Sequence, residues 1–208
     1  MLQAIDNIIT QVRPKMWALL RTRAHYDLRT LVNQFKTHLW GLMEIHNGAI
    51  FHAATTHLNK IDSLQRHFLH ELDIPEEDSF MRFNFAPPSV RRDIGILGLL
   101  HKRVLGKAHP VYQKLLPFHN EVFGSLNPAL HRFQLYGHSR EVLRQHNLFD
   151  RSIFAMVYVY NRLPLEILEC PTVTCFQKQL TCMVREACKA GDDRWKLTFN
   201  SRVPRYLD

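Results

Sequence analysis

Apolar residues recur along most of this chain at the spacing of an α-helix. After Asp27, whose side chain can cap a helix N-terminus, apolar residues fall on a single helical face. They are Leu28, Leu31, Val32, Phe35, Leu39 and Leu42. A second series covers 50–72, and Asn47-Gly48 is predicted to separate the two helices. Two consecutive amphipathic helices of this kind are expected to pack antiparallel through their apolar faces.

The same period predicts three further helices, over 89–105, over 153–160, and from Thr172 or Thr174 to about residue 190. No stretch alternates convincingly, as a half-buried strand would. Gly95 and Gly98 lie inside the nearly all-apolar helix 89–105, where we expect them to let a neighbouring element approach closely. We therefore predict an all-α protein, an irregular multi-helix bundle with one or two long proline-containing loops.

The chain begins with an apolar stripe over 4–12 that has no N-cap before it, as in a sequence that starts inside a longer helix. Pro14 suits the first turn of a separate short helix that carries Met16, Trp17 and Leu20. Prolines and changes of composition divide the rest. We predict a basic helical part over 1–75, a linker over 76–90, a C-terminal helical part over 91–190 and a tail over 191–208, with an internal loop over 116–130.

No apolar run approaches the ~20 residues that a membrane-spanning helix needs. The longest, Ile94–Leu100 and Phe154–Tyr160, have seven residues each. The first 20 residues include charged side chains and no apolar core of a signal peptide. We expect an intracellular protein, nuclear or cytoplasmic and not secreted, with no membrane partner and with reduced cysteines.

The chain is basic, with 27 Lys and Arg against 19 Asp and Glu, a formal net charge of +8. Such a field attracts polyanions, either nucleic acid or acidic lipid. Basic residues gather in two regions, before residue 37 and on the helix 89–105. The candidate nucleic-acid-binding residues are Arg13, Lys15, Arg21, Arg23, Arg29 and Lys36, followed by Arg91, Arg92, Lys102 and Arg103. Plain solubilising charge is the alternative interpretation of both regions.

Metal and catalytic motifs are missing or incomplete. His70-Glu71 lacks the second histidine that a zinc-protease helix places four residues after the first. The four cysteines are separated by four, six and five residues, without the close pair of a zinc finger, so we expect buried thiols at Cys175 and Cys182. Asp192-Asp193 follows a helix and is predicted to be a solvated turn. We predict no catalytic residues, no metal and no cofactor, hence no enzyme.

Several short motifs occur in a particular order over about residues 10–185. They include Arg13-Pro14-Lys15, Gln34-Phe35-Lys36, Asn47-Gly48-Ala49-Ile50, Arg91-Arg92-Asp93-Ile94-Gly95 and Tyr160-Asn161-Arg162-Leu163-Pro164. Together they resemble the C-terminal, post-catalytic part of the polyprotein of non-LTR (LINE-type, jockey-like) retrotransposons, in particular the copies found in dinoflagellates. Tyr160 stands where that family commonly has tryptophan, which weakens the closing motif.

The resemblance implies a reverse transcriptase whose catalytic aspartates lie upstream, since no Tyr-x-Asp-Asp occurs in this chain. What remains corresponds to a helical, thumb-like part and the region beyond it. A thumb packs helices along the template–primer duplex and contacts phosphates, which is a task for Lys and Arg.

Our leading hypothesis is therefore a fragment of an RNA-directed DNA polymerase that lacks the palm and retains non-specific binding to RNA or DNA backbones. The upstream palm is a possible partner. A non-enzymatic helical protein-interaction module is the alternative, and it predicts an exposed apolar patch. A degenerate reading frame without a selected role is the third interpretation.

Overall fold

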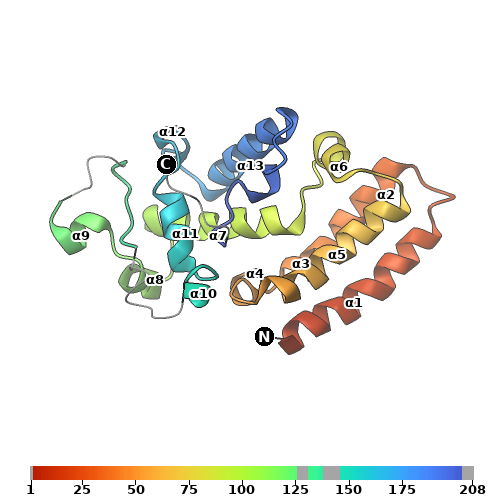
Figure 1. Ribbon diagram of the computed structural model, residues 1–208, viewed down its shortest axis with the longest axis horizontal. Helices are drawn as coiled ribbons and strands as arrows, with labels where there is room; N and C mark the ends of the chain where they lie inside the picture. The colour runs from red at the N-terminus through yellow and green to blue at the C-terminus, as the bar shows by residue number, and fades with distance from the viewer. Residues whose placement is uncertain (1, 126–130, 138–145, 203–208) are drawn as a thin grey trace. The chain divides into compact units, whose positions relative to one another are not determined.

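The computed structural model describes residues 2–125, 131–137 and 146–202, and all its regular elements are helical. No strand occurs among those residues, where the one extended pairing is an isolated bridge between Phe118 and Leu135. The all-α prediction is confirmed (Figure 1). The helices are α1 (Leu2–Arg21), α2 (Leu28–Phe35), the π-helical segment η1 (Lys36–Trp40), α3 (Gly41–Glu44), α4 (Asn47–Ile50), α5 (Thr55–Glu71), α6 (Glu76–Phe83), α7 (Pro88–Val104), α8 (Pro110–Leu115), α9 (His119–Phe123), α10 (His146–Phe149), α11 (Ile153–Tyr160), α12 (Leu165–Leu168), α13 (Val173–Lys189) and the 3₁₀ turn η2 (Trp195–Leu197).

The chain forms two compact units. Unit 1 contains Met1–Arg92 and Cys188–Lys196, and unit 2 contains the described residues of Asp93–Ala187 and those from Leu197 onward. The boundary therefore falls inside α7, after Arg92, instead of in the linker predicted over 76–90.

In unit 1, α1 is one helix of 20 residues that passes through Pro14. The separate short helix predicted to begin at Pro14 is wrong. A proline inside a helix costs about 3 kcal/mol, but five apolar side chains on one face of α1 are fully buried. Each contributes about 1.5–3 kcal/mol, which outweighs that cost. They are Ile5, Ile8, Val12, Met16 and Leu20.

Asp27 caps α2, because its side chain accepts a hydrogen bond from the backbone N–H of Thr30. The predicted antiparallel packing is borne out, since Phe35 meets Phe68 of α5 with ring centroids 4.5 Å apart, and the Trp40 indole donates to Gln65 further back along α5. The predicted start of the second helix at residue 50 is wrong. Residues 47–50 form the separate helix α4, and α5 begins at Thr55, after extended backbone at Ala54.

The interval 76–83, predicted as linker, is the helix α6. Glu76, Glu77 and Asp78 occupy its first turn, where acidic side chains complement the helix dipole. Phe80 is fully buried and stacks on Trp195 of η2, at 5.4 Å between centroids. Residues 191–202 are consequently folded, in contrast to the predicted tail, whose residues 203–208 lie outside the described residues.

Unit 2 is organised around His101 on α7. Its Nε2 lies 2.9 Å from the Cys170 carbonyl oxygen, which can only accept, so Nε2 carries the proton. Nδ1 then accepts from the Tyr160 hydroxyl at 3.1 Å, and the imidazole stacks on Phe176 of α13, with centroids 4.1 Å apart. The helix predicted over 153–160 is confirmed as α11, which places Tyr160 in this cluster.

The close approach of a neighbouring element, predicted at Gly95 and Gly98, is found at Gly98 alone. A Cβ at Gly98 would collide with the Gln177 amide on α13, whereas a Cβ at Gly95 would meet nothing within 4 Å. Thr172 rather than Thr174 caps α13, since its hydroxyl oxygen accepts from the Cys175 backbone N–H.

The loop predicted over 116–130 contains the short helix α9, which ends at Gly124 in the left-handed conformation. Residues 126–130 of that prediction lie outside the described residues.

Unit 2 is expected to lose stability as the pH falls below about 6.5. Burial lowers the pKa of His101, partly offset by the Cys170 carbonyl, and burial likewise lowers the pKa of His131. Between the unfolded value and these lower folded values the unfolded chain binds more protons, so stability decreases on acidification. Urea unfolding of the native protein and of His101→Gln between pH 7.5 and 5.5 should show a shallower decline in the variant. Equal declines in the two proteins would show that protonation of His101 does not cause the loss of stability.

Candidate nucleic-acid interface

Four of the predicted basic residues are exposed on α1 and at the beginning of α2. Arg13, Lys15, Arg21 and Arg29 are all exposed, and none has an ion-pair partner among the described residues. Arg23 is also exposed but forms an ion pair with Glu71 of α5 at 3.1 Å. We call the four unpaired residues the α1–α2 basic surface. Exposed cations that form no ion pair can bind phosphates without breaking an internal contact.

Lys36, the sixth of the N-terminal candidates, is partly buried and already engaged. Its ammonium group donates to the Phe83 carbonyl oxygen and lies 5.5 Å from the Trp40 ring centroid. Burial lowers the pKa of Lys36, with a smaller contribution from the charge of Arg91. We therefore place Lys36 with the internal contacts of unit 1 and outside the α1–α2 basic surface.

Arg91 and Arg92 lie within unit 1 as structural residues. Arg91 forms a two-pronged ion pair with Glu44, and its guanidinium carbon is 3.5 Å from the Trp40 ring centroid. Arg92 is 5% exposed and pairs with Asp62 of α5 through both terminal nitrogens, at 2.6 and 2.8 Å. The prediction of a phosphate contact at Arg92 is wrong, because a buried, doubly bonded guanidinium cannot reach a solvent-borne phosphate.

Arg103, in unit 2, is also buried. Its Nε donates to the Leu116 carbonyl at 3.0 Å, Nη2 lies 3.6 Å from Glu121, and the guanidinium covers the Phe118 ring at 4.4 Å. The predicted nucleic-acid contact at Arg103 is therefore wrong as well. Lys102 is exposed, but it belongs to α7 of unit 2 and is not part of the α1–α2 basic surface.

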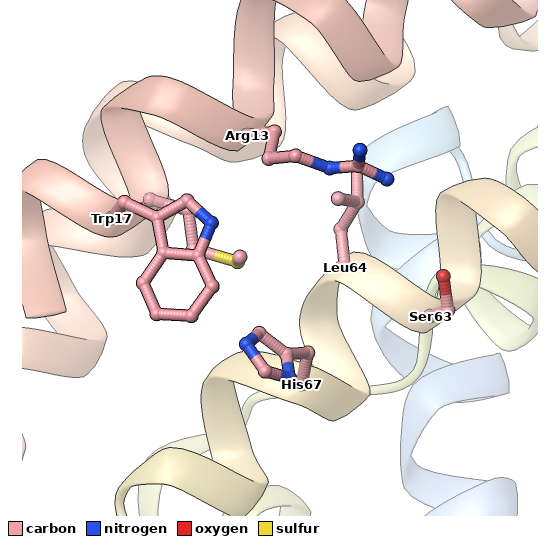
Figure 2. A pocket seen from close by; sticks show the side chains of 6 residues that line it. Arg13, Trp17, Ser63, Leu64 and His67 are labelled. Carbon is pink, nitrogen blue, oxygen red and sulfur yellow. The ribbon is translucent and has the colours of Figure 1, made fainter.

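A groove runs between α1 and α5, the helices that Figure 1 shows side by side. One part, of about 470 Å³, is lined by Arg13, Trp17, Ser63, Leu64 and His67 (Figure 2), and by Met16. The Trp17 indole and the His67 imidazole meet edge to face, with centroids 4.9 Å apart. We call this hollow and its continuation the α1–α5 groove.

The continuation of the groove is a second hollow of about 430 Å³ that shares Arg13 and Ser63 with the first. It adds Lys60 from α5, together with Asp6, Ile9 and Thr10 from α1. The α1–α5 groove therefore combines cations from two helices with one exposed aromatic ring.

Trp17 and Lys60 were not among the predicted site residues. Ile9, Arg13 and Trp17 recur every four residues along one flank of α1, beside the buried stripe. That spacing is visible in the sequence, but it indicates a groove only once the partner helix and its direction are known.

Metal ligands do not converge in the described part of the chain, where no group of three or more His, Cys, Asp or Glu side chains is placed to hold an ion. None of the four cysteines, all of which lie in the described ranges, forms a disulfide. The expectation of buried thiols fails at Cys182, which is exposed, and at Cys175, which is half-exposed. Cys170 is the buried one; burial and the nearby Cys175 thiol raise its pKa to about 11, and the two sulfurs are 3.1 Å apart.

Within the described ranges, every helix is too short or too polar to cross a lipid bilayer. Comparison with family models, with curated proteins and with solved structures found no match to this chain.

Proposed function

We propose that this chain binds the sugar–phosphate backbone of RNA or DNA non-specifically, as the post-catalytic helical part of a non-LTR reverse transcriptase without its palm. The observation that carries the binding proposal is the α1–α2 basic surface: four exposed cations in one unit that form no ion pair among the described residues. The ordered motifs over about residues 10–185 support the proposed parentage.

Phosphate contact explains why this surface has cations and no base-reading motif. Three of the four side chains are arginines, whose planar guanidinium can bond two phosphate oxygens at once. Contacts to phosphates hold and orient a nucleic acid without reading its sequence. Binding releases condensed counterions, so it weakens as the salt concentration rises.

The salt dependence of binding tests the proposal. With four phosphate contacts, the logarithm of the association constant should fall against the logarithm of salt with a slope of about −3 to −4. The variant R13Q/K15Q/R21Q/R29Q should bind at least tenfold more weakly at 50 mM salt and show a slope near zero. Fluorescence anisotropy with labelled oligonucleotides measures both quantities.

The matched control is K107Q/K114Q/R162Q/K178Q, which removes the same charge from four exposed positions of unit 2. It should keep most of the affinity and of the slope. Flat salt dependence of the native protein, or equal losses in the two variants, would refute binding through the α1–α2 basic surface.

The protein-interaction alternative is favoured by a different observation, the exposed apolar side chains of α8 and α9. Val111, Val122 and Phe123 are exposed by 60%, 44% and 58%. Co-expression with the upstream polymerase segment would test whether they are a face that the segment covers. Protection of Phe123 and its neighbours from hydrogen exchange only in the co-expressed pair would support that role, and unchanged exchange would reject it.

A further inference from the structure

All three tryptophans lie in the described part of the chain, and among them Trp17 has the substantially exposed ring. Its exposed fraction is 43%, whereas Trp195 is 3% exposed and the Trp40 ring is covered by Phe85 and Arg91. Large aromatic rings are normally buried, because each contributes much to the hydrophobic core. On α1, the core positions on either side, Met16 and Leu20, are filled, so Trp17 is not needed there. It borders the α1–α5 groove instead (Figure 2).

We propose that the α1–α5 groove binds an unpaired nucleotide, with its base stacked on Trp17 and its phosphate at Arg13, so that the preferred ligand is single-stranded nucleic acid. This inference rests on the proposed backbone binding and names the class of nucleic acid that the same unit selects.

The placement of the two side chains carries the first step. Arg13 precedes Trp17 by four residues, one helical turn or about 6 Å along the axis of α1, on the same flank. Figure 2 shows that both side chains come from α1 and border the same hollow. A nucleotide lying along α1 therefore meets an aromatic face and a cation in succession. Lys60, in the adjoining hollow, offers a second cation to the next phosphate.

The Trp17 ring is the reason to expect a preference for single-stranded over duplex nucleic acid. In a duplex each base has its two faces covered by its neighbours, so an indole outside the helix can only touch the backbone. An unpaired base presents a free face, and stacking on an aromatic side chain contributes a five- to hundredfold gain in affinity. The His67 imidazole packs against the indole in a T-shaped contact, at 4.9 Å between centroids, so the ring has a partner on the facing wall of the groove.

The charges that line the groove favour a nucleic acid over an apolar peptide as the ligand. The groove contains the cations Arg13 and Lys60 against the single carboxylate of Asp6. Beyond it, Arg21 follows Trp17 by four residues along the same helix. A polyanion of several nucleotides can follow these charges away from the groove, whereas an apolar helix would leave them without partners.

The test compares the native protein with W17A and W17F, using a 12-residue oligothymidylate and a 12-base-pair duplex at the same salt concentration. W17A should weaken single-strand binding by about five- to hundredfold and change duplex binding less than twofold, with the salt slope preserved because no charge is removed. W17F, which keeps a ring, should recover most of the affinity. Tryptophan fluorescence should be quenched on binding in the native protein and much less in W17F.

The control is Y26A, which removes another exposed ring of unit 1, 53% exposed and outside the groove. It should alter single-strand affinity less than twofold. Unchanged single-strand binding by W17A, equal losses on both ligands, or an equal loss in Y26A would overturn the inference. In each case a steep salt slope that vanishes in R13Q/K15Q/R21Q/R29Q would still support backbone binding, so the two proposals fail separately.

Discussion

Replacing Arg92 with alanine is expected to lower the free energy of unfolding by about 3–5 kcal/mol. The guanidinium and the Asp62 carboxylate are both buried, and they meet through two hydrogen bonds of 2.6 and 2.8 Å. Without Arg92 the carboxylate stays inside unit 1 with its charge uncompensated, which is far more costly than losing a surface pair. Urea unfolding followed by circular dichroism measures the change.

The double variant R92M/D62L tests whether the loss in R92A comes from the uncompensated Asp62 carboxylate. Replacing both charges with apolar side chains of similar volume removes the uncompensated carboxylate, so most of the lost stability should return. R13A is the matched surface control, since an exposed arginine without an ion pair should change stability by no more than about 0.5 kcal/mol. A loss below 1 kcal/mol in R92A would show that the Asp62–Arg92 pair is not closed to water.

This contrast shows what the amino-acid sequence alone can specify about the site. Charge counts select Arg13 and Arg92 equally, because both lie in basic stretches. Asp62, the partner that removes Arg92 from the surface, is 30 residues away and belongs to another helix. Burial of a charge depends on which helices pair, and no local pattern encodes that.

Long helices were predictable because a continuous apolar face reports directly on its own burial. The ends of α7 and α11 fall within a residue or two of the expected positions, at Val104 and Tyr160. Short helices such as α6 have too few residues for a period to emerge, and three prolines over 75–88 suggested a linker. Tertiary packing decided that segment, through the burial of Phe80.

The α1–α5 groove shows the same limit from the functional side. Arg13 was predicted from charge, whereas Trp17 was assigned to a short apolar helix. The two become one site only because α1 continues through Pro14 and packs beside α5. That continuity comes from five buried side chains, which a local rule about proline does not weigh.

Replacing Phe35 with alanine is the second large effect, a loss of about 3–5 kcal/mol. Its side chain is fully buried at the end of α2, with ring centroids 4.5 Å from Phe68 and 5.2 Å from Phe85. Truncation removes the transfer free energy of the ring and leaves a cavity that three segments of unit 1 border. Thermal or urea unfolding of the purified variant measures the loss.

The exposed ring of Phe123 provides the matched substitution, because F123A removes the same atoms from a side chain that is 58% exposed. It should cost no more than about 0.5 kcal/mol. F35L, which keeps a large apolar side chain, should fall between the two, since it leaves a smaller cavity. Similar losses in F35A and F123A would contradict a core centred on Phe35. The packing that holds α2 against α5 would then have to come from other residues. The same packing positions His67 on the α5 wall of the groove.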